Sequence, residues 1–343
     1  MPITFGSQVP APPWAAPPAG RPGLRSFWIA VLLGWVVLAA AGVGYARVKS
    51  IPLSMAWPVL AAFLLEYPFY LVPGFEAVRS WAELRLRPLF LAACLTLSAV
   101  LPYLVFSLGT GQFSGKALLE LGALALAVSL WYVVLPRHTL VDLGFLALLA
   151  AVLLCKYFDP IYPPPVPQLK GISVLGHVAL VYQAAIVLLV LRRVRGVGFG
   201  FVPTRLEWAI GVQHFLYFLP IGFPLALWLG QIHLDQPNWL WWRLIGTFFG
   251  ILWVVALSED FFFWGLIYPW MGQWSGNRRL AHFATAVLFA LVHLPFGGFP
   301  NWRYALLVGV MGWFCGRAYD RAGSIRAAMV THALVVTLRA ALR

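Results

Sequence analysis

The chain has 343 residues, of which 62% are hydrophobic and only 10% are charged, and its formal net charge is +13. A soluble domain carries roughly 25% charged residues, so this composition excludes an ordinary soluble protein and predicts a protein embedded in a lipid bilayer. It also disfavours nucleic-acid binding, because the arginines gather at the ends of apolar runs and form no continuous basic face.

Eleven apolar segments predict an all-α fold, a polytopic transmembrane bundle of about ten or eleven helices. In chain order they are residues 27–45, 51–72, 88–108, 117–135, 139–155, 172–191, 210–230, 240–268, 280–294, 304–319 and 325–338. The eighth segment is long for one crossing, which would place the acidic pair Glu259–Asp260 near its polar end. The last segment is short for a full crossing and is expected to be tilted or enclosed by its neighbours.

Composition divides the chain into three regions. Residues 1–24 are rich in Pro, Ala and Gly and predict a disordered tail, and the apolar run that follows is read as a retained helix. The basic stretch 192–205 separates a first set of transmembrane helices, residues 25–195, from a C-terminal core, residues 205–343. A proline-rich stretch, residues 159–167, predicts a stiff, extended connection inside the first set.

Loop charges give an expected orientation. Arginines concentrate in the loops after the second, fourth, sixth, eighth and tenth segments, which by the positive-inside rule face the cytoplasm. The N-terminus is then cytoplasmic, and a bacterial plasma membrane is the expected location. The three cysteines, Cys94, Cys155 and Cys315, lack metal-ligand spacing and are expected to be small buried hydrophobic residues.

Four ionisable side chains interrupt the apolar segments of the C-terminal core. They are Glu259 and Asp260 in the eighth segment, His293 in the ninth and His332 in the eleventh. Charged groups inside a bilayer are costly and by default mark a functional site. Because carboxylates and imidazoles exchange protons, their conjunction predicts a buried acid–base site in which a carboxylate takes a proton from water.

Two other uses of these residues stay open. Two histidines and one carboxylate form a known zinc-binding set, so a divalent metal such as zinc bound by Glu259, His293 and His332 is an alternative to a site without cofactors. Glu66 lies in the second segment and could join them in a proton-coupled transporter. The chain has no His-Glu-x-x-His motif and no Gly-x-Ser-x-Gly turn, which argues against a soluble-type metalloprotease or a serine hydrolase.

Residues 240–338 resemble the CPBP family of intramembrane proteases, also called the CAAX protease and bacteriocin-processing (Abi) family. The family motif Glu-Glu-x-x-x-Arg-Gly corresponds to residues 259–265, and Phe-x-x-x-His is met by Phe289 and His293. The motif His-x-x-x-Asn/Asp corresponds to His332 with Val336 at its last position. Asp260 stands in place of the second Glu, and Trp264 in place of the Arg, for which Arg278 or Arg279 could substitute.

The resemblance implies an endopeptidase that cleaves a membrane-associated or hydrophobic peptide or protein substrate. Glu259 is the implied base that activates water, assisted by His293, while His332 binds the water or the oxyanion. No metal is required for that mechanism. Because Trp264 and Val336 remove polar groups, a membrane scaffold or immunity protein without catalysis is the alternative within the family, and the sequence assigns no oligomeric state.

Overall fold

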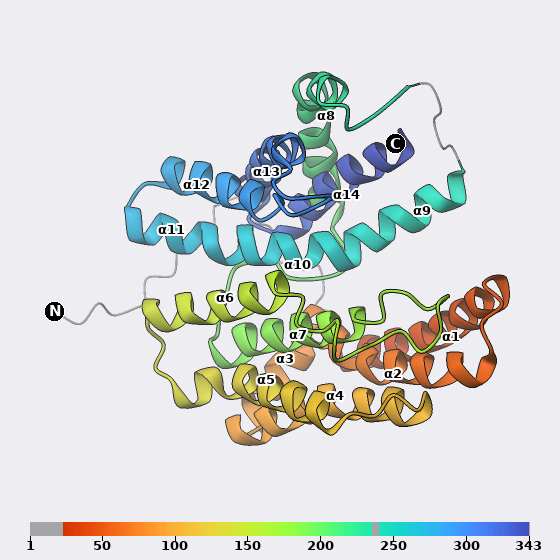
Figure 1. The fold of residues 1–343 in the computed structure, drawn as a ribbon. Helices are drawn as coiled ribbons and strands as arrows, with labels where there is room; N and C mark the ends of the chain where they lie inside the picture. Colours follow the sequence, from red (N-terminus) through yellow and green to blue (C-terminus); the bar gives the residue numbers. More distant parts are fainter. Residues whose placement is uncertain (1–22, 235–239, 343) are drawn as a thin grey trace. The chain divides into compact units, whose positions relative to one another are not determined.

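The computed structural model describes residues 23–234 and 240–342, and within them it contains helices and no strand (Figure 1). Each of the eleven predicted segments forms a helix, so the all-α prediction is confirmed. The predicted tail lies almost wholly outside the described residues. The described chain forms two compact units, which meet in sequence between Arg195 and Gly196.

The N-terminal unit runs to Arg195. Its helices are α1 (Leu24–Val48), α2 (Leu53–Leu71), the short η1 (Val72–Gly74), α3 (Glu76–Arg85), α4 (Pro88–Gly109), α5 (Gly115–Val134), α6 (Thr139–Leu154), α7 (Val174–Ile186) and its continuation η2 (Val187–Leu191). The α7–η2 segment is the most enclosed of the long apolar helices, because 78% of its 18 residues are buried. It packs against α2, α4 and α5, so this unit is built around α7.

Acidic residues of the N-terminal unit hold the basic stretch that follows η2. Arg192 donates to both carboxylate oxygens of Asp142, at 2.8 and 2.9 Å, and Arg193 pairs with Glu83 at 2.8 Å. Arg195 also contacts Glu83. These arginines therefore stabilise the end of the unit in addition to carrying positive charge.

The proline-rich stretch differs from its prediction. Residues 155–173 form a series of turns instead of a stiff, extended connection, and the side chains of Phe158, Ile161 and Tyr162 are each 1% exposed. The prolines alternate with large apolar side chains, whose burial favours a folded path over an extended one.

The C-terminal unit begins at Gly196. Its helices are α8 (Arg205–Trp228), α9 (Trp241–Gly250), η3 (Ile251–Ala256), α10 (Leu257–Asp260), η4 (Phe261–Ile267), α11 (Tyr268–Ser275), α12 (Arg278–Leu291), α13 (Trp302–Ala322) and α14 (Ile325–Ala341). Helix α8 packs against both α13 and α14, and α13 also packs against α12. The carboxylate of Glu207 on α8 accepts from Arg326 on α14 at 2.8 Å, which ties the ends of these two helices together.

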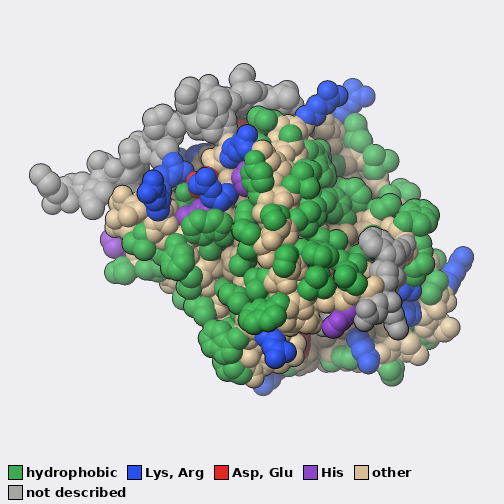
Figure 2. Space-filling view, turned by 90° about the horizontal axis from the view of Figure 1, so that it is seen from above, with side chains coloured by type: hydrophobic (Ala, Val, Ile, Leu, Met, Phe, Trp, Pro, Cys, Tyr) green, Lys and Arg blue, Asp and Glu red, His purple; other side chains and the backbone are tan. Residues whose placement is uncertain are grey.

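Seven helical segments in the described residues are long and apolar enough to cross a membrane. They are Leu24–Val48, Leu53–Gly74, Pro88–Gly109, Gly115–Val134, Val174–Leu191, Arg205–Trp228 and Trp241–Ser275. Helix α6 is apolar but shorter, α12 and α14 have only 14 and 17 residues, and α13 is not among the seven. Hydrophobic side chains cover most of the face in Figure 2, as expected of an integral, multi-pass membrane protein.

Candidate active site

The acidic pair lies in the middle of a 35-residue helical segment, Trp241–Ser275. This corrects the prediction that the pair lies near a polar end, because the helix continues through α11 beyond the predicted segment. The four residues of α10 that carry the pair are flanked on both sides by π-helical segments, η3 and η4. Such wide turns inside a helix are rare and occur frequently at functional sites, where they redirect side chains.

Glu259 is the point on which the two predicted histidines converge. Its Oε2 atom is 3.6 Å from Nε2 of His293 and 3.9 Å from Nε2 of His332. The Glu259 side chain is 25% exposed, whereas those of His293 and His332 are 7% and 2% exposed. One carboxylate oxygen thus faces two imidazoles from the edge of a largely buried cluster.

Asp260, the neighbour of Glu259 on α10, is the fourth residue of this cluster. It is fully buried, and its Oδ1 atom is 3.4 Å from Nδ1 of His332. His332 therefore presents each ring nitrogen to a different carboxylate. A neutral imidazole has one N–H, so His332 can donate to both carboxylates only when it is protonated to an imidazolium.

His293 is oriented by the helix that precedes it. Helix α12 ends at Leu291, so His293 lies in the turn just beyond the helix and not within it. Its Nδ1 is 2.7 Å from the carbonyl oxygen of Phe289, one of the last carbonyls of α12 that lack a helical N–H partner. A carbonyl only accepts, so Nδ1 carries a proton and Nε2 is left to face Glu259.

Phe289 fills the space between the two histidines. Its ring is fully buried, with its centroid 4.9 Å from that of His293 and 5.8 Å from that of His332. The backbone of Gly312 lies against this ring, since a Cβ atom there would be 2.7 Å from it. The residue predicted as the first part of the Phe-x-x-x-His motif therefore separates the imidazoles and sets their spacing.

Trp264 occupies the position where the resemblance expects arginine. It is fully buried, and its indole nitrogen has no hydrogen-bond partner among the described residues. Its ring lies 5.5 Å from that of His282. Arg278 does not replace the missing cation at the cluster, because it donates to Asp320 at 2.9 Å and to Tyr268 at 3.4 Å. The acidic turn is thus accompanied by an aromatic ring where a positive charge was expected.

Cys315 is a neighbour of the cluster that sequence reasoning missed. Its thiol, a carboxylate oxygen of Asp260 and a ring nitrogen of His332 all lie within 4.8 Å of one another, and all three residues are buried. The sequence predicts three small buried cysteines, and this holds for Cys315, whereas Cys94 is partly buried and the prediction is wrong for Cys155, which is exposed. The available signal was its spacing from Gly312. Helix residues three apart share a face, so Cys315 lies on the face of α13 where Gly312 meets the ring of Phe289.

Two sets of side chains in this cluster have the chemistry of zinc ligands. Asp260, Cys315 and His332 form one, and Glu259 with the two histidines forms the other. Carboxylate, imidazole and thiolate are all common ligands of that ion. His332 belongs to both sets, so a bound metal would compete with the hydrogen bonds that His332 makes to the acidic pair.

Comparison with known proteins agrees with the motifs. Residues 237–338 match the family of Rce1-like proteins, described as type II CAAX prenyl endopeptidase Rce1-like. No curated protein and no solved structure matches the chain significantly. The predicted resemblance is confirmed over this segment, which supports an intramembrane endopeptidase of the CAAX type and contains all four clustered residues.

Proposed function

We propose that the protein hydrolyses a peptide bond within the membrane by means of water activated at Glu259. The observation that supports this most directly is the convergence of His293 and His332 on one oxygen of Glu259, at 3.6 and 3.9 Å. These gaps are longer than direct hydrogen bonds, and Oε2 has no hydrogen-bond partner among the described residues. A water molecule held at this oxygen would have the carboxylate base and a ring nitrogen of each histidine beside it.

In the proposed reaction, Glu259 acts as general base. As the oxygen of the water attacks the scissile carbonyl carbon, one of its protons passes to the Glu259 carboxylate and the carbonyl π-electrons move onto oxygen. Carboxylates placed in dry surroundings are effective bases near neutral pH, and such proton transfer contributes about 10²–10⁴-fold to a rate.

His332 and His293 take the two remaining roles. The N–H of His332 at Nε2 would donate to the developing oxyanion, while Asp260 at 3.4 Å holds the other ring nitrogen and fixes the orientation of the ring. The tetrahedral intermediate then collapses and the C–N bond breaks. The proton taken by Glu259 passes to the leaving amine, with His293 beside the carboxyl group to assist the transfer.

The proposed substrate is a peptide or protein anchored in the membrane. The matched family is named for CAAX prenyl endopeptidases, so lipid-modified C-terminal segments are the first class to test. A buried polar site in a helix bundle suits a substrate that already partitions into the bilayer, because it reaches the site without crossing bulk water.

The test is cleavage of a membrane-peptide library, including prenylated peptides, by the purified protein in lipid nanodiscs. Glu259→Gln keeps the size of the side chain and removes its basicity, so we expect a loss of about 10²–10⁴-fold. Glu120→Gln is the matched control, because Glu120 only pairs with Lys116 at 3.8 Å on the surface of α5 and its loss should leave cleavage unchanged.

A chelator added to the same assay separates the metal alternative. Cleavage that survives the chelator but not Glu259→Gln supports the metal-free reaction. Cleavage lost with the chelator and restored by zinc would move Glu259, His293 and His332 into ligand roles, where the ion would polarise the carbonyl. A folded wild type that cleaves no peptide in the library would refute the endopeptidase and favour the non-catalytic scaffold.

A further inference from the structure

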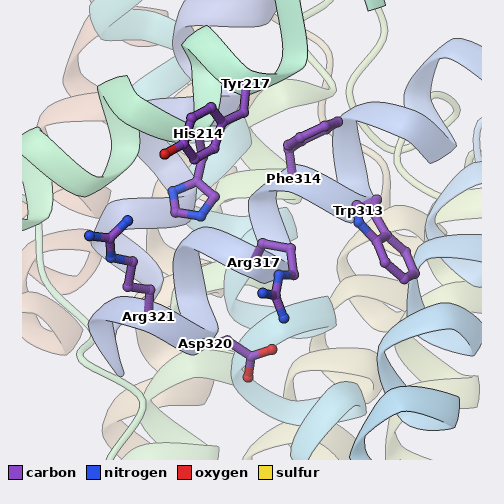
Figure 3. A pocket seen from close by; sticks show the side chains of 7 residues that line it. All are labelled: His214, Tyr217, Trp313, Phe314, Arg317, Asp320 and Arg321. Atoms are coloured by element: carbon purple, nitrogen blue, oxygen red, sulfur yellow. The ribbon is translucent and has the colours of Figure 1, made fainter. Parts of the chain in front are cut away.

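A polar pocket of about 410 Å³ lies between α8 and α13, apart from the four residues of the candidate active site (Figure 3). His214 and Tyr217 line it from α8, and Arg317, Asp320 and Arg321 line it from α13. Its volume is in the range of small-molecule sites, about 300–1,000 Å³. No step of the proposed peptidase reaction uses these residues.

Two arginines give the pocket an excess of positive charge. Arg317 and Arg321 are four residues apart, share one face of α13 and are exposed. Arg321 donates to the side-chain oxygen of Gln213, and Arg317 makes no hydrogen bond or ion pair within the described part of the chain. An arginine retains several N–H groups after making one bond, so both guanidinium groups can still bind an anion.

The one carboxylate in the pocket is already compensated. Oδ1 of Asp320 accepts from Tyr268 at 2.6 Å and from Arg278 at 2.9 Å, and Oδ2 lies 3.4 Å from Nδ1 of His282. These partners lie on α11 and α12. Asp320 therefore does not neutralise Arg317 and Arg321, and the pocket keeps its positive character.

The α8 side of the pocket adds polar groups that can bind an oxyanion. Nδ1 of His214 lies 2.8 Å from the carbonyl oxygen of Ile210, so it donates there and Nε2 is left unused by that bond. Tyr217 accepts from Gln213 at 2.6 Å through its hydroxyl oxygen, which leaves its own O–H available as a donor.

An apolar groove adjoins this pocket and shares two lining residues with it. It has a volume of about 490 Å³ and is lined by Phe283 and Val287 of α12, Leu306 and Val310 of α13 and Ile221 of α8. Trp313 and Phe314 line both the groove and the polar pocket. From Phe314 to Arg321 the helix rises only about 10 Å, so a cationic end and an apolar end form one elongated site.

We propose that this site binds an anionic glycerophospholipid, with the phosphate at Arg317 and Arg321 and an acyl chain in the groove between α12 and α13. Guanidinium groups bind phosphate oxygens in a bidentate manner, and an apolar channel beside them suits a hydrocarbon chain. Charge complementarity and the two lining residues that the cavities share select this occupant. A free phosphate would leave the groove unused, and an apolar peptide would leave the arginines unpaired.

The experiment is native mass spectrometry of the purified full-length protein titrated with dioleoylphosphatidylglycerol or dioleoylphosphatidylcholine. We expect the anionic lipid to bind more tightly. Arg317→Gln combined with Arg321→Gln should weaken it by about tenfold or more, because each arginine near an anionic lipid surface contributes substantially to binding. Arg279→Gln combined with Arg303→Gln is the matched control, since it removes the same charge from exposed positions that do not line the pocket.

A second variant tests the apolar half. Val310→Trp fills the groove and should weaken lipid binding while leaving binding of glycerol 3-phosphate to the arginines unchanged. If glycerol 3-phosphate binds as tightly as the lipid and Val310→Trp has no effect, the site takes a free phosphate ester and the lipid assignment is wrong.

Equal binding of the two lipids, or no difference between the pocket variant and its control, would also overturn the proposal. So would displacement of the lipid by a farnesylated peptide with a free carboxylate, because the groove would then belong to substrate. Thermal unfolding of each variant, compared with its control, shows that any loss of binding occurs in folded protein.

Discussion

The C-terminal unit contains two clusters in which a histidine faces an acidic side chain, and they differ in what surrounds them. In the first, Glu259 and Asp260 face His293 and His332, with no arginine in the contacts that define the cluster. In the second, Asp320 faces His282 at 3.4 Å but also accepts from Tyr268 and Arg278. Trp264 lies next to the second cluster, on the same helical segment as the acidic pair.

This is the difference that we expect between the proposed reactive cluster and a structural one. Asp320 accepts from Tyr268 and Arg278 and lies beside His282, so both of its carboxylate oxygens have partners that link α13 to α11 and α12. Oε2 of Glu259 and Oδ2 of Asp260 have no hydrogen-bond partner in the described parts of the chain. Buried polar atoms are normally satisfied, so unsatisfied oxygens beside imidazoles agree with the proposal that water or substrate binds there.

Exchanging the two histidines for asparagine should produce the largest contrast. His332→Asn is expected to lower the rate of peptide cleavage by about 10²–10³-fold, because it removes an oxyanion donor, with little change in unfolding temperature. His282→Asn should do the reverse, since His282 links Asp320 to the carbonyl oxygen of Trp313, 3.1 Å from its Nε2. Cleavage kinetics and thermal unfolding of both variants check this. Equal losses of activity would remove the distinction between the clusters.

A methyl group at Gly316 should disturb the packing of the helices between the clusters. A Cβ atom there would lie 2.4 Å from the ring of Trp264 and 2.8 Å from that of His282. Overpacking of this kind costs about 1–3 kcal/mol, so Gly316→Ala should lower the unfolding temperature. Gly246→Ala is the control, because nothing lies within 4 Å of its Cβ position and alanine favours a helix. A Gly316→Ala protein as stable as this control would show that the contact relaxes without cost.

The smallest expected effect concerns the pH dependence of stability. Burial by itself would raise the pKa of Asp320, but hydrogen bonds from His282 and Tyr268 and the charge of Arg278 hold this pKa below its ordinary value. A lowered carboxyl pKa contributes stability above the unfolded value, about pH 3.9, and this contribution disappears as the pH falls through the folded value. Asp320→Asn should therefore destabilise by about 1 kcal/mol at pH 7 and by less at pH 3.

Unfolding temperatures of wild type and Asp320→Asn, measured from pH 7 to pH 3 in one detergent, check this dependence. The difference between the two proteins should narrow as the solution becomes more acidic. A difference that stays constant with pH would mean that the charge of Asp320 contributes nothing.

Glu66 is a buried carboxyl group in the N-terminal unit. Like Glu259, it is a carboxyl group in an apolar segment, but the sequence favours a functional role only for Glu259 and Asp260 and leaves Glu66 open between a functional and a structural role. In the structure it is 1% exposed on α2, and neither carboxyl oxygen has a hydrogen-bond partner among the described residues. Among the described residues, Glu259 and Asp260 have imidazoles beside them and no such contact is found for Glu66, so the transporter alternative gains no support from the surroundings of Glu66.

The sequence by itself determined the helical class, the eleven helices and the four residues of the cluster. Long apolar runs in a bilayer must satisfy every backbone group within a helix, and charges within such runs are costly, so by default they mark a functional site. Local patterns of this kind need no knowledge of the fold. They failed at the polar helix α3, which lacks an apolar run, and at the proline-rich stretch, where burial of aromatic side chains outweighs the preference for an extended chain.

The tertiary structure decided which partners each side chain has. The separation of His293 from His332 by Phe289 and the proximity of Cys315 to Asp260 arise from contacts between helices distant in sequence, and the apolar pattern did not predict the π-helical turns around α10. Arg278 donates to Asp320 and not to the acidic pair because α12 and α13 pack together. The partners of a side chain depend on which helix faces pack together. On α13 the small residues Gly312 and Gly316 allow the rings of Phe289 and Trp264 to approach the backbone closely.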